Sequence, residues 1–71
     1  MAVEKMSGFP RRLRELRKSK NVSLRVLADF CDVSKSTLAR YEQGKQKPTA
    51  DIIVKLAEFF GVSTDSLLGK K

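Results

Sequence analysis

Two short amphipathic segments, residues 24–31 and 35–43, are separated by only three residues, and this spacing constrains the fold more than any other feature. Two helices joined by so short a turn cross at a steep angle and need a small residue where they touch. Ala28 supplies the small residue, while Val33 in the turn and Leu38 in the second segment fill the angle. The pattern therefore predicts a helix-turn-helix arrangement whose second helix is exposed along one side.

Three further segments of helical periodicity flank this pair: residues 9–20, residues 50–60 and a last turn or two ending at Leu67 and Leu68. Favoured N-cap residues precede four of the five expected helices: Ser23, Ser34, Thr49 and Ser63. Residues that accept a left-handed conformation follow four of them: Asn21, Asp32, Gly44 and Gly61. Apolar residues at helical spacing form the expected core: Phe9, Leu13, Leu16, Leu24, Leu27, Ala28, Cys31, Leu38, Tyr41, Ile53, Leu56, Ala57 and Phe60.

No stretch shows the alternation of a β-strand, so the pattern predicts an all-α fold, a compact five-helix bundle. We expect a single domain over residues 9–69, preceded by a flexible N-terminal tail, residues 1–8, that carries no periodic pattern. The chain of 71 residues contains one cysteine and no histidine, which excludes an intrachain disulfide and a Cys/His zinc site. Packing alone must stabilise the fold.

Positive charge is concentrated in the first two thirds of the chain. Residues 1–48 contain twelve Lys and Arg against five Asp and Glu, whereas residues 49–71 contain three of each, so the net charge of +7 lies in the first part. This segregation is typical of a protein that docks one face on a polyanion. A solvated basic surface without a partner is the alternative explanation.

From Arg12 to Leu68 the sequence resembles the Cro/repressor-type (Xre) helix-turn-helix domains of phage repressors and small bacterial transcriptional regulators. The motifs that carry the resemblance are Arg12-Leu13-Arg14-Glu15-Leu16-Arg17, Leu27-Ala28, Asp32-Val33-Ser34-Lys35-Ser36-Thr37-Leu38, Tyr41-Glu42-Gln43-Gly44-Lys45, Pro48, Leu56-Ala57, Phe60-Gly61-Val62-Ser63 and Leu67-Leu68. The resemblance implies a lambda-repressor-like fold with the helix-turn-helix at its second and third helices.

The resemblance further implies that base edges are read from the third helix, here by Lys35, Ser36, Thr37 and Arg40. The chemistry of these side chains agrees, because Lys and Arg donate to guanine and a hydroxyl contacts either a base or a phosphate. The alternative is that all four are ordinary solvated residues of a surface helix.

Phosphate contacts are expected from the N-terminus of the second helix at Ser23 and Arg25, where backbone N–H groups and the helix dipole favour an anion. Lys45 and Lys47 in the connector after the third helix add two cations. Arg17 resembles the family arginine that reaches the DNA backbone while pairing with a glutamate at the end of the third helix, here Glu42. Structural support is assigned to Ala28, Val33, Leu38 and Glu42.

The sequence departs from the family pattern at three places. Leu24 stands where the family often has a glutamine that contacts phosphate, and Asp32 stands where it often has glycine. Phe30 and Phe59 occupy positions that are often polar or small, and they form either a satellite of the core or an exposed patch for a partner.

These features together predict a sequence-specific double-stranded DNA-binding protein, a transcriptional regulator and repressor that binds a pseudo-palindromic operator as a homodimer. The alternative is an antitoxin or adaptor-type protein-interaction module in which DNA binding is secondary. An enzyme is not expected, because Cys31 lies on an inner helical face and has no histidine to act as its base. No cofactor, metal or small-molecule ligand is predicted.

Neither a signal peptide nor a membrane span is apparent in the sequence, so we expect no contact with a membrane and a cytoplasmic location.

Overall fold

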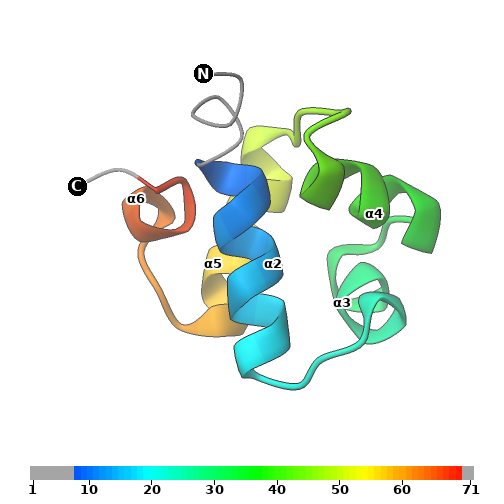
Figure 1. Cartoon of the computed structure of the whole chain (residues 1–71), viewed down its shortest axis with the longest axis horizontal. Helices are drawn as coiled ribbons and strands as arrows, with labels where there is room; N and C mark the ends of the chain where they lie inside the picture. The colour runs from blue at the N-terminus through cyan, green and yellow to red at the C-terminus, as the bar shows by residue number, and fades with distance from the viewer. Residues whose placement is uncertain (1–7, 70–71) are drawn as a thin grey trace.

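The computed structural model describes residues 8–69, and within this range every regular element is an α-helix, as predicted (Figure 1). The helices are α2 (Phe9–Ser19), α3 (Leu24–Cys31), α4 (Lys35–Gln43), α5 (Ala50–Phe60) and α6 (Thr64–Leu67). The tail predicted for residues 1–8 lies outside the described residues except for Gly8, which is the N-cap of α2.

The helices begin where the sequence places their caps. The side-chain oxygen of the cap residue accepts a hydrogen bond from a backbone N–H three residues later in α3, α4, α5 and α6. The cap residues are Ser23, Ser34, Thr49 and Ser63, as predicted. A cap of this kind contributes about 1 kcal/mol to helix stability, so the four together fix the boundaries of these short helices.

The predicted left-handed residues follow the helices. Asn21 and Asp32 have φ values of 57° and 60°, and Gly44 and Gly61 have φ values of 74° and 69°. Asp32 therefore adopts a conformation that glycine adopts more readily, at a cost of roughly 1 kcal/mol. This conformation makes the turn short enough for α4 to pack directly against α3.

One core joins all five helices. Its buried members are Leu13, Leu27, Ala28, Cys31, Leu38, Tyr41, Ile52, Leu56, Ala57, Phe60 and Leu67. The sequence predicted Ile53 rather than Ile52 for the first turn of α5, but Ile52 is the buried residue and Ile53 is partly buried. Both lie on the core side of the helix, and Ile52 continues the four-residue row through Leu56 to Phe60, which is the row that packs inward.

Helix α2 occupies the middle of the molecule and contacts α4 on one side and α6 on the other (Figure 1). Helix α3 contacts α4 and α5, and α5 contacts α6. The helix-turn-helix pair α3–α4 therefore lies on the side of α2 opposite to α6.

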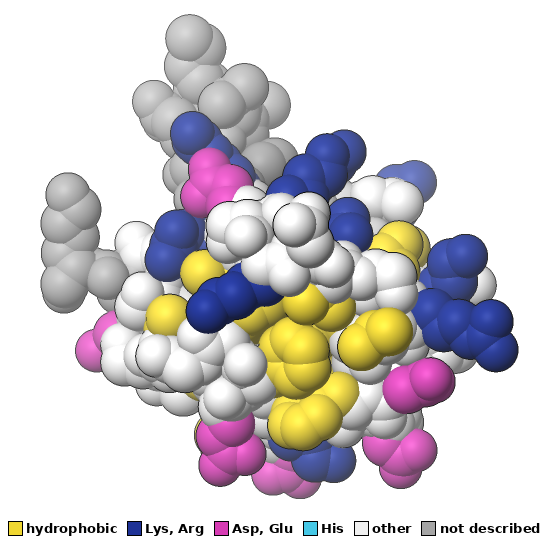
Figure 2. All heavy atoms as spheres, turned by 90° about the horizontal axis from the view of Figure 1, so that it is seen from below, with side chains coloured by type: hydrophobic (Ala, Val, Ile, Leu, Met, Phe, Trp, Pro, Cys, Tyr) yellow, Lys and Arg dark blue, Asp and Glu magenta, His cyan; other side chains and the backbone are white. Residues whose placement is uncertain are grey.

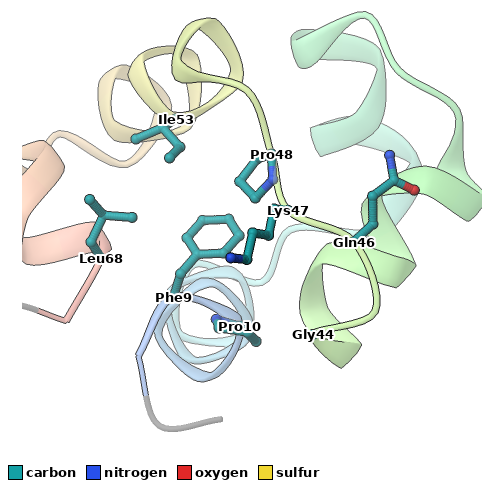
Figure 3. Close-up of a pocket in the computed structure, with 8 residues that line it drawn as sticks. All are labelled: Phe9, Pro10, Gly44, Gln46, Lys47, Pro48, Ile53 and Leu68. Atoms are coloured by element: carbon teal, nitrogen blue, oxygen red, sulfur yellow. The ribbon is translucent and has the colours of Figure 1, made fainter. Parts of the chain in front are cut away.

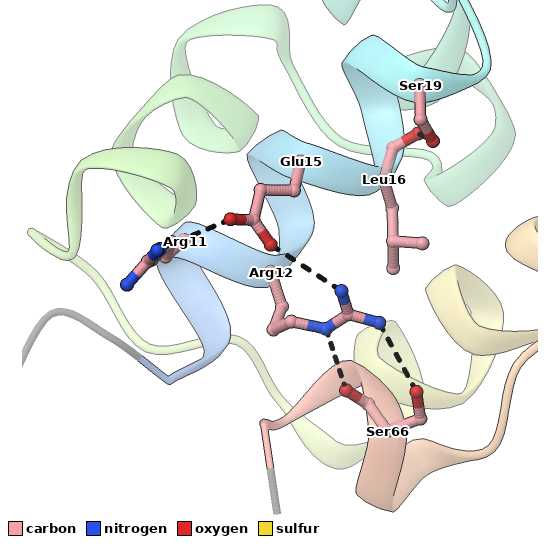
Figure 4. A network of polar contacts seen from close by, with 6 residues as sticks. All are labelled: Arg11, Arg12, Glu15, Leu16, Ser19 and Ser66. Carbon is pink, nitrogen blue, oxygen red and sulfur yellow. Dashed lines mark hydrogen bonds and ion pairs between the residues drawn. The ribbon is translucent and has the colours of Figure 1, made fainter.

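A polar network attaches α6 to α2 (Figure 4). Arg12 donates from Nε to the backbone oxygen of Ser66 at 3.2 Å and from Nη2 to the Ser66 hydroxyl at 3.4 Å. Glu15 faces Arg12 at 3.5 Å and also Arg11 at 3.2 Å, so its carboxylate orients the Arg12 guanidinium. This network holds a helix of four residues that is too short to be stable by itself.

The two ends of the described chain, at Gly8 and Gly69, lie close together beside this network. A Cβ atom at Gly69, where φ is +80°, would lie only 3.1 Å from the Cα of Gly8, and one at Gly8 would lie 3.3 Å from the oxygen of Leu68. Glycine at both positions lets the two backbone segments approach to van der Waals contact.

Within residues 8–69, no helix is both long enough and apolar enough to cross a membrane. The same residues contain no cluster of three or more His, Cys, Asp or Glu side chains that could hold a metal ion.

Cys31 is 1% exposed and belongs to the core, as predicted. Burial raises the pKa of its thiol, and the positive charge of Lys55 lowers it by less than burial raises it. We predict that Cys31→Ser lowers the free energy of unfolding by about 1–3 kcal/mol, because a hydroxyl replaces an apolar group in the core. Cys31→Ala, which buries no polar group, should lose less in the same urea titration.

Native-state labelling with a thiol reagent provides a second readout for Cys31. The wild-type protein should react far more slowly than the urea-unfolded chain, since the thiol is both buried and protonated. Equal labelling rates in the two states would contradict the burial of Cys31.

Candidate nucleic-acid interface

The α3–α4 pair is held by the residues assigned to structural support. Ala28 of α3 and Leu38 of α4 are both buried, and Val33 in the turn is partly buried against the core. The Val33 N–H donates to the oxygen of Ala28 at 3.0 Å, which ends α3 and directs the chain into α4. The small Ala28 side chain allows the turn to approach α3 closely, as the three-residue spacing requires.

Helix α4 presents a polar face to solvent, opposite Leu38 and Tyr41. Lys35, Ser36 and Arg40 are exposed on this helix. Ser36 and Arg40 lie four residues apart and therefore stand one turn above the other on the same face. Three of the four residues predicted to read bases are therefore exposed to solvent on α4.

Thr37, the fourth, has a different environment. Its backbone N–H donates to the Ser34 hydroxyl at 3.0 Å, and its own hydroxyl accepts from Ser34 at 2.9 Å. The Thr37 side chain is partly buried and takes part in the cap of α4. Its hydroxyl stands at the helix N-terminus, nearer to the turn than to the exposed face.

Gln43 is a residue of this face that sequence reasoning missed. It is exposed and lies three residues after Arg40, so it extends the row begun by Ser36. A glutamine side chain can make two parallel hydrogen bonds to adenine. The helical spacing from Arg40 was the available signal.

Arg17 and Glu42 form a bidentate ion pair between α2 and α4. Arg17 Nε lies 2.5 Å from Glu42 Oε2, and Arg17 Nη2 donates to Oε1 at 3.2 Å. The side chains are only 15% and 7% exposed. Arg17 Nη1 also donates to the oxygen of Val22 at 3.1 Å. One guanidinium therefore ties α2 both to the end of α4 and to the segment that leads into α3.

A shallow hollow lies beside the N-terminus of α3. It is lined by Arg17, Lys18, Asn21, Val22 and Ser23. Two of the lining residues, Arg17 and Lys18, are positively charged, and the hollow adjoins the positive end of the α3 helix dipole. Lys18 was not among the predicted site residues.

Arg25 is exposed in the first turn of α3, whereas Leu24 is partly buried and packs against the core. The Leu24 side chain therefore contributes packing and offers no polar group to a phosphate.

Arg14 is a second cation near the site that was not among the predicted site residues. Together with Arg17 it lines a hollow of about 200 Å³ whose other walls are Leu24 of α3 and Ala39, Glu42 and Gln43 of α4. The exposed Arg14 side chain therefore stands next to the polar face of α4. Its spacing of three residues from Arg17 was the only sign of this in the sequence.

The connector after α4 carries two exposed lysines, Lys45 and Lys47. The N–H of Lys45 donates to the oxygen of Arg40 at 2.9 Å, which closes the C-terminal end of α4 and fixes where the connector starts. The connector thus follows directly from the helix that carries the predicted base-reading residues.

Phe30 and Phe59 form a satellite of the core that stays partly open to solvent. Their rings pack edge to face with centroids 5.0 Å apart, and Phe59 packs in the same way on buried Phe60 at 5.2 Å. Phe30 nevertheless remains 47% exposed, and Val26 on the same side of α3 remains 53% exposed. Hydrophobic side chains gather in the middle of the face seen in Figure 2, with charged side chains around them.

The fold and this arrangement of helices define a helix-turn-helix protein. The family model described as "Helix-turn-helix" matches residues 13–67, which is most of the chain, so the chain belongs to the helix-turn-helix family. This is a family of non-enzymatic regulators, in agreement with the prediction that the chain is not an enzyme.

Among curated proteins, the chain is 45% identical over 60 residues to the HTH-type transcriptional regulator AnsR of Bacillus subtilis. The match covers 84% of this chain and 52% of AnsR, so the chain spans about half the length of that relative.

Two solved structures show the same fold. The restriction-modification controller protein C.AhdI from Aeromonas hydrophila superposes with a TM-score of 0.80 at 30% identity, over 90% of this chain and 97% of that protein. The P22 c2 repressor, solved in complex with a synthetic operator, superposes with a TM-score of 0.82 at 22% identity, over 89% of this chain and 96% of the repressor. At 22% identity this second likeness shows the fold alone, and it confirms the predicted lambda-repressor-like bundle.

The Arg17–Glu42 pair yields a stability prediction. We expect Glu42→Ala to lower the free energy of unfolding by about 3 kcal/mol, because it leaves the Arg17 guanidinium buried without its counter-charge. Urea denaturation of the purified variant measures the loss. The control is Glu15→Ala, which breaks half-exposed pairs with both Arg11 and Arg12 and should cost about 0.5–1 kcal/mol.

Replacing both partners, in Arg17→Met with Glu42→Leu, should recover much of the stability that Glu42→Ala loses, since no unpaired charge remains. Equal losses for Glu42→Ala and Glu15→Ala would show that the buried pair contributes no more than a surface contact.

Proposed function

We propose that this chain is a sequence-specific double-stranded DNA-binding domain of a transcriptional regulator, which places α4 in the major groove. The observation that carries the proposal is the exposed polar face of α4, held against α2 by the Arg17–Glu42 pair and against α3 by the short turn. A helix mounted in this way presents side chains to a groove while the rest of the bundle stays outside it. Residues 9–69 act as one such domain.

Base reading is assigned to Lys35, Ser36, Thr37 and Arg40. Arg40 can make two parallel hydrogen bonds to guanine, and Lys35 can donate to the same base. Thr37, whose hydroxyl already accepts a hydrogen bond from Ser34, can contact either a base or a phosphate.

Phosphate binding is assigned to Ser23 and Arg25 at the start of α3, to Lys45 and Lys47 in the connector, and to Arg17. The Arg17 guanidinium makes three contacts within the protein and has further N–H donors left for a phosphate oxygen. These contacts fix the register of the protein on DNA without reading sequence.

We further propose that DNA occupancy represses transcription, because a bound domain excludes other proteins from the same site without any additional contact. The protein acts in the cytoplasm and needs no cofactor. A template carrying the operator over a promoter should give less transcript in vitro as the protein is added, and an increase would indicate activation.

A homodimer on a pseudo-palindromic operator accounts for specificity, since one recognition helix reads only a few base pairs. Half-sites one helical turn apart have centres about 34 Å from each other. The molecule measures 33 × 23 × 23 Å, so two copies can lie side by side at this spacing.

The assignment of Arg40 predicts a loss of sequence preference. Arg40→Ala should reduce operator binding by about 1–3 kcal/mol, which is the typical value of a bidentate contact to guanine, and should hardly change binding to a scrambled duplex. Lys45→Ala is the matched control, because loss of a phosphate contact weakens binding to both duplexes and lowers the salt slope by about one unit.

Fluorescence titrations of both variants on both duplexes over a range of salt concentrations measure these quantities. An operator selected from random duplex DNA supplies the specific sequence. If Arg40→Ala weakened binding to both duplexes alike, Arg40 would be a backbone contact, and base reading would rest on the other residues of α4.

The dimer makes a separate prediction for the operator. Footprinting at saturation should protect two half-sites about 10 base pairs apart, related by two-fold symmetry. Protection of one asymmetric half-site at saturating protein would contradict the dimer.

The second candidate function is an antitoxin or adaptor-type protein-interaction module with DNA binding secondary. The exposure of Phe30 and Val26 favours it, because side chains of this kind on α3 offer an apolar contact to another protein. Loss of partner capture in Phe30→Ser with unchanged DNA binding would separate this role from the first.

A further inference from the structure

An apolar pocket lies beside the connector between α4 and α5 (Figure 3). Its volume is about 330 Å³, and its walls are Phe9, Pro10, Gly44, Gln46, Lys47, Pro48, Ile53 and Leu68. These residues come from the start of α2, the connector, the first turn of α5 and the end of α6. The sequence does not predict this pocket, because the residues that line it are separated by up to 59 positions along the chain.

The lining is mostly hydrophobic, with a single charged side chain. Phe9, Ile53 and Leu68 are partly buried and form the apolar floor. Lys47 is the one charged residue of the lining, and its side chain extends toward the Phe9 ring (Figure 3). Among residues 8–69 no carboxylate pairs with Lys47. A ligand that is complementary to this lining has an apolar body and one negative charge.

The size of the pocket favours a small molecule over a protein segment. Small-molecule sites in proteins are concave, mainly apolar and have volumes from about 300 Å³ upward, with few polar groups that fix the orientation of the ligand. The pocket, with a volume of about 330 Å³, is near the lower end of this range. A compact monocarboxylate therefore fits both its volume and its charge.

We propose that this pocket binds a small apolar carboxylic acid, with its carboxylate on Lys47 and its body against Phe9, Ile53 and Leu68. Binding removes Lys47 from the set of side chains available to DNA, because one ammonium cannot pair with the ligand and a phosphate at full strength. The protein is then less tightly held on DNA in the presence of the acid. This second step rests on the proposed function, whereas the ligand site does not.

The ligand site is tested with 3-phenylpropanoate, and with 3-phenylpropanamide as its uncharged analogue. Titration of the ¹⁵N-labelled full chain with the acid should give saturable shifts in the amide signals of Phe9, Gln46, Lys47, Ile53 and Leu68. An exposed ion pair contributes about a two- to fivefold difference in affinity, so the amide should bind that much more weakly.

Lys47→Gln and Lys45→Gln form a matched pair of variants, since both lysines are exposed in the same connector and only Lys47 lines the pocket. Lys47→Gln should bind the acid about two- to fivefold more weakly and the amide unchanged. Lys45→Gln should bind both like the wild-type protein. Equal affinity of wild-type and Lys47→Gln protein for the acid, or shifts centred on Val26 and Phe30, would overturn the ligand site.

The coupling to DNA is measured separately with a duplex at fixed salt concentration. The acid should weaken DNA binding by wild-type and Lys45→Gln protein and leave Lys47→Gln unaffected. If the acid saturated the pocket with no change in DNA affinity, the coupling would be overturned and the ligand site would stand. If the chain bound no duplex in any condition, the proposed function would fail, while the titration of the pocket would still decide the ligand site.

Discussion

The Arg17–Glu42 pair is the contact on which the orientation of the other candidate interface elements depends. Glu42 stands in the last turn of α4, and Arg17 stands in the last turn of α2, so their bidentate contact sets the angle of α4 against the central helix. The third bond of the guanidinium, to the oxygen of Val22, positions the segment that enters α3. A single largely buried cation therefore determines how the start of α3 and the end of α4 are presented together.

Two residues of the α3–α4 pair, Asp32 and Leu24, are locally less favourable than the alternatives at their positions. Asp32 adopts a left-handed conformation that glycine would adopt more easily, and Leu24 contributes packing where the family often has a polar contact to phosphate. Leu24 adds apolar packing to the core, whereas Asp32 is exposed in the turn and adds none. Apolar packing is also added by Phe30 and Phe59, whose edge-to-face contact extends the core toward the surface between α3 and α5.

The sequence predicted most of the fold because its signals are local. Four helix starts are marked by cap residues that accept a hydrogen bond from the backbone N–H three residues later: Ser23, Ser34, Thr49 and Ser63. Four helix ends are marked by residues that accept a left-handed conformation: Asn21, Asp32, Gly44 and Gly61. The exchange of Ile53 for Ile52 shows the limit of such signals, since both positions fit a helical stripe and only the packing of α5 against its neighbours decides between them.

Long-range contacts were harder to predict. Arg17 and Glu42 are 25 residues apart, and only the family resemblance suggested that they pair. Arg14 and Lys18 were missed, because their place beside the candidate interface depends on how α2 lies against α3 and α4. Gln43 was missed although its spacing of three residues from Arg40 places it on the same helix face. The pocket around Lys47 was invisible for the same reason, since it exists only where four segments of the chain meet.

The contact between Gly8 and Gly69 has a consequence for the architecture of larger proteins that contain this domain. Both ends of the described chain leave from one corner, beside α6 and the start of α2, whereas α3 and α4 lie on the other side of the central helix (Figure 1). A second domain can therefore be attached before or after this one without covering the helix-turn-helix, and a short linker between the two ends would permit circular permutation of the bundle. The glycine pair thus makes the domain a module that can be inserted into a longer chain as readily as it can be appended to one.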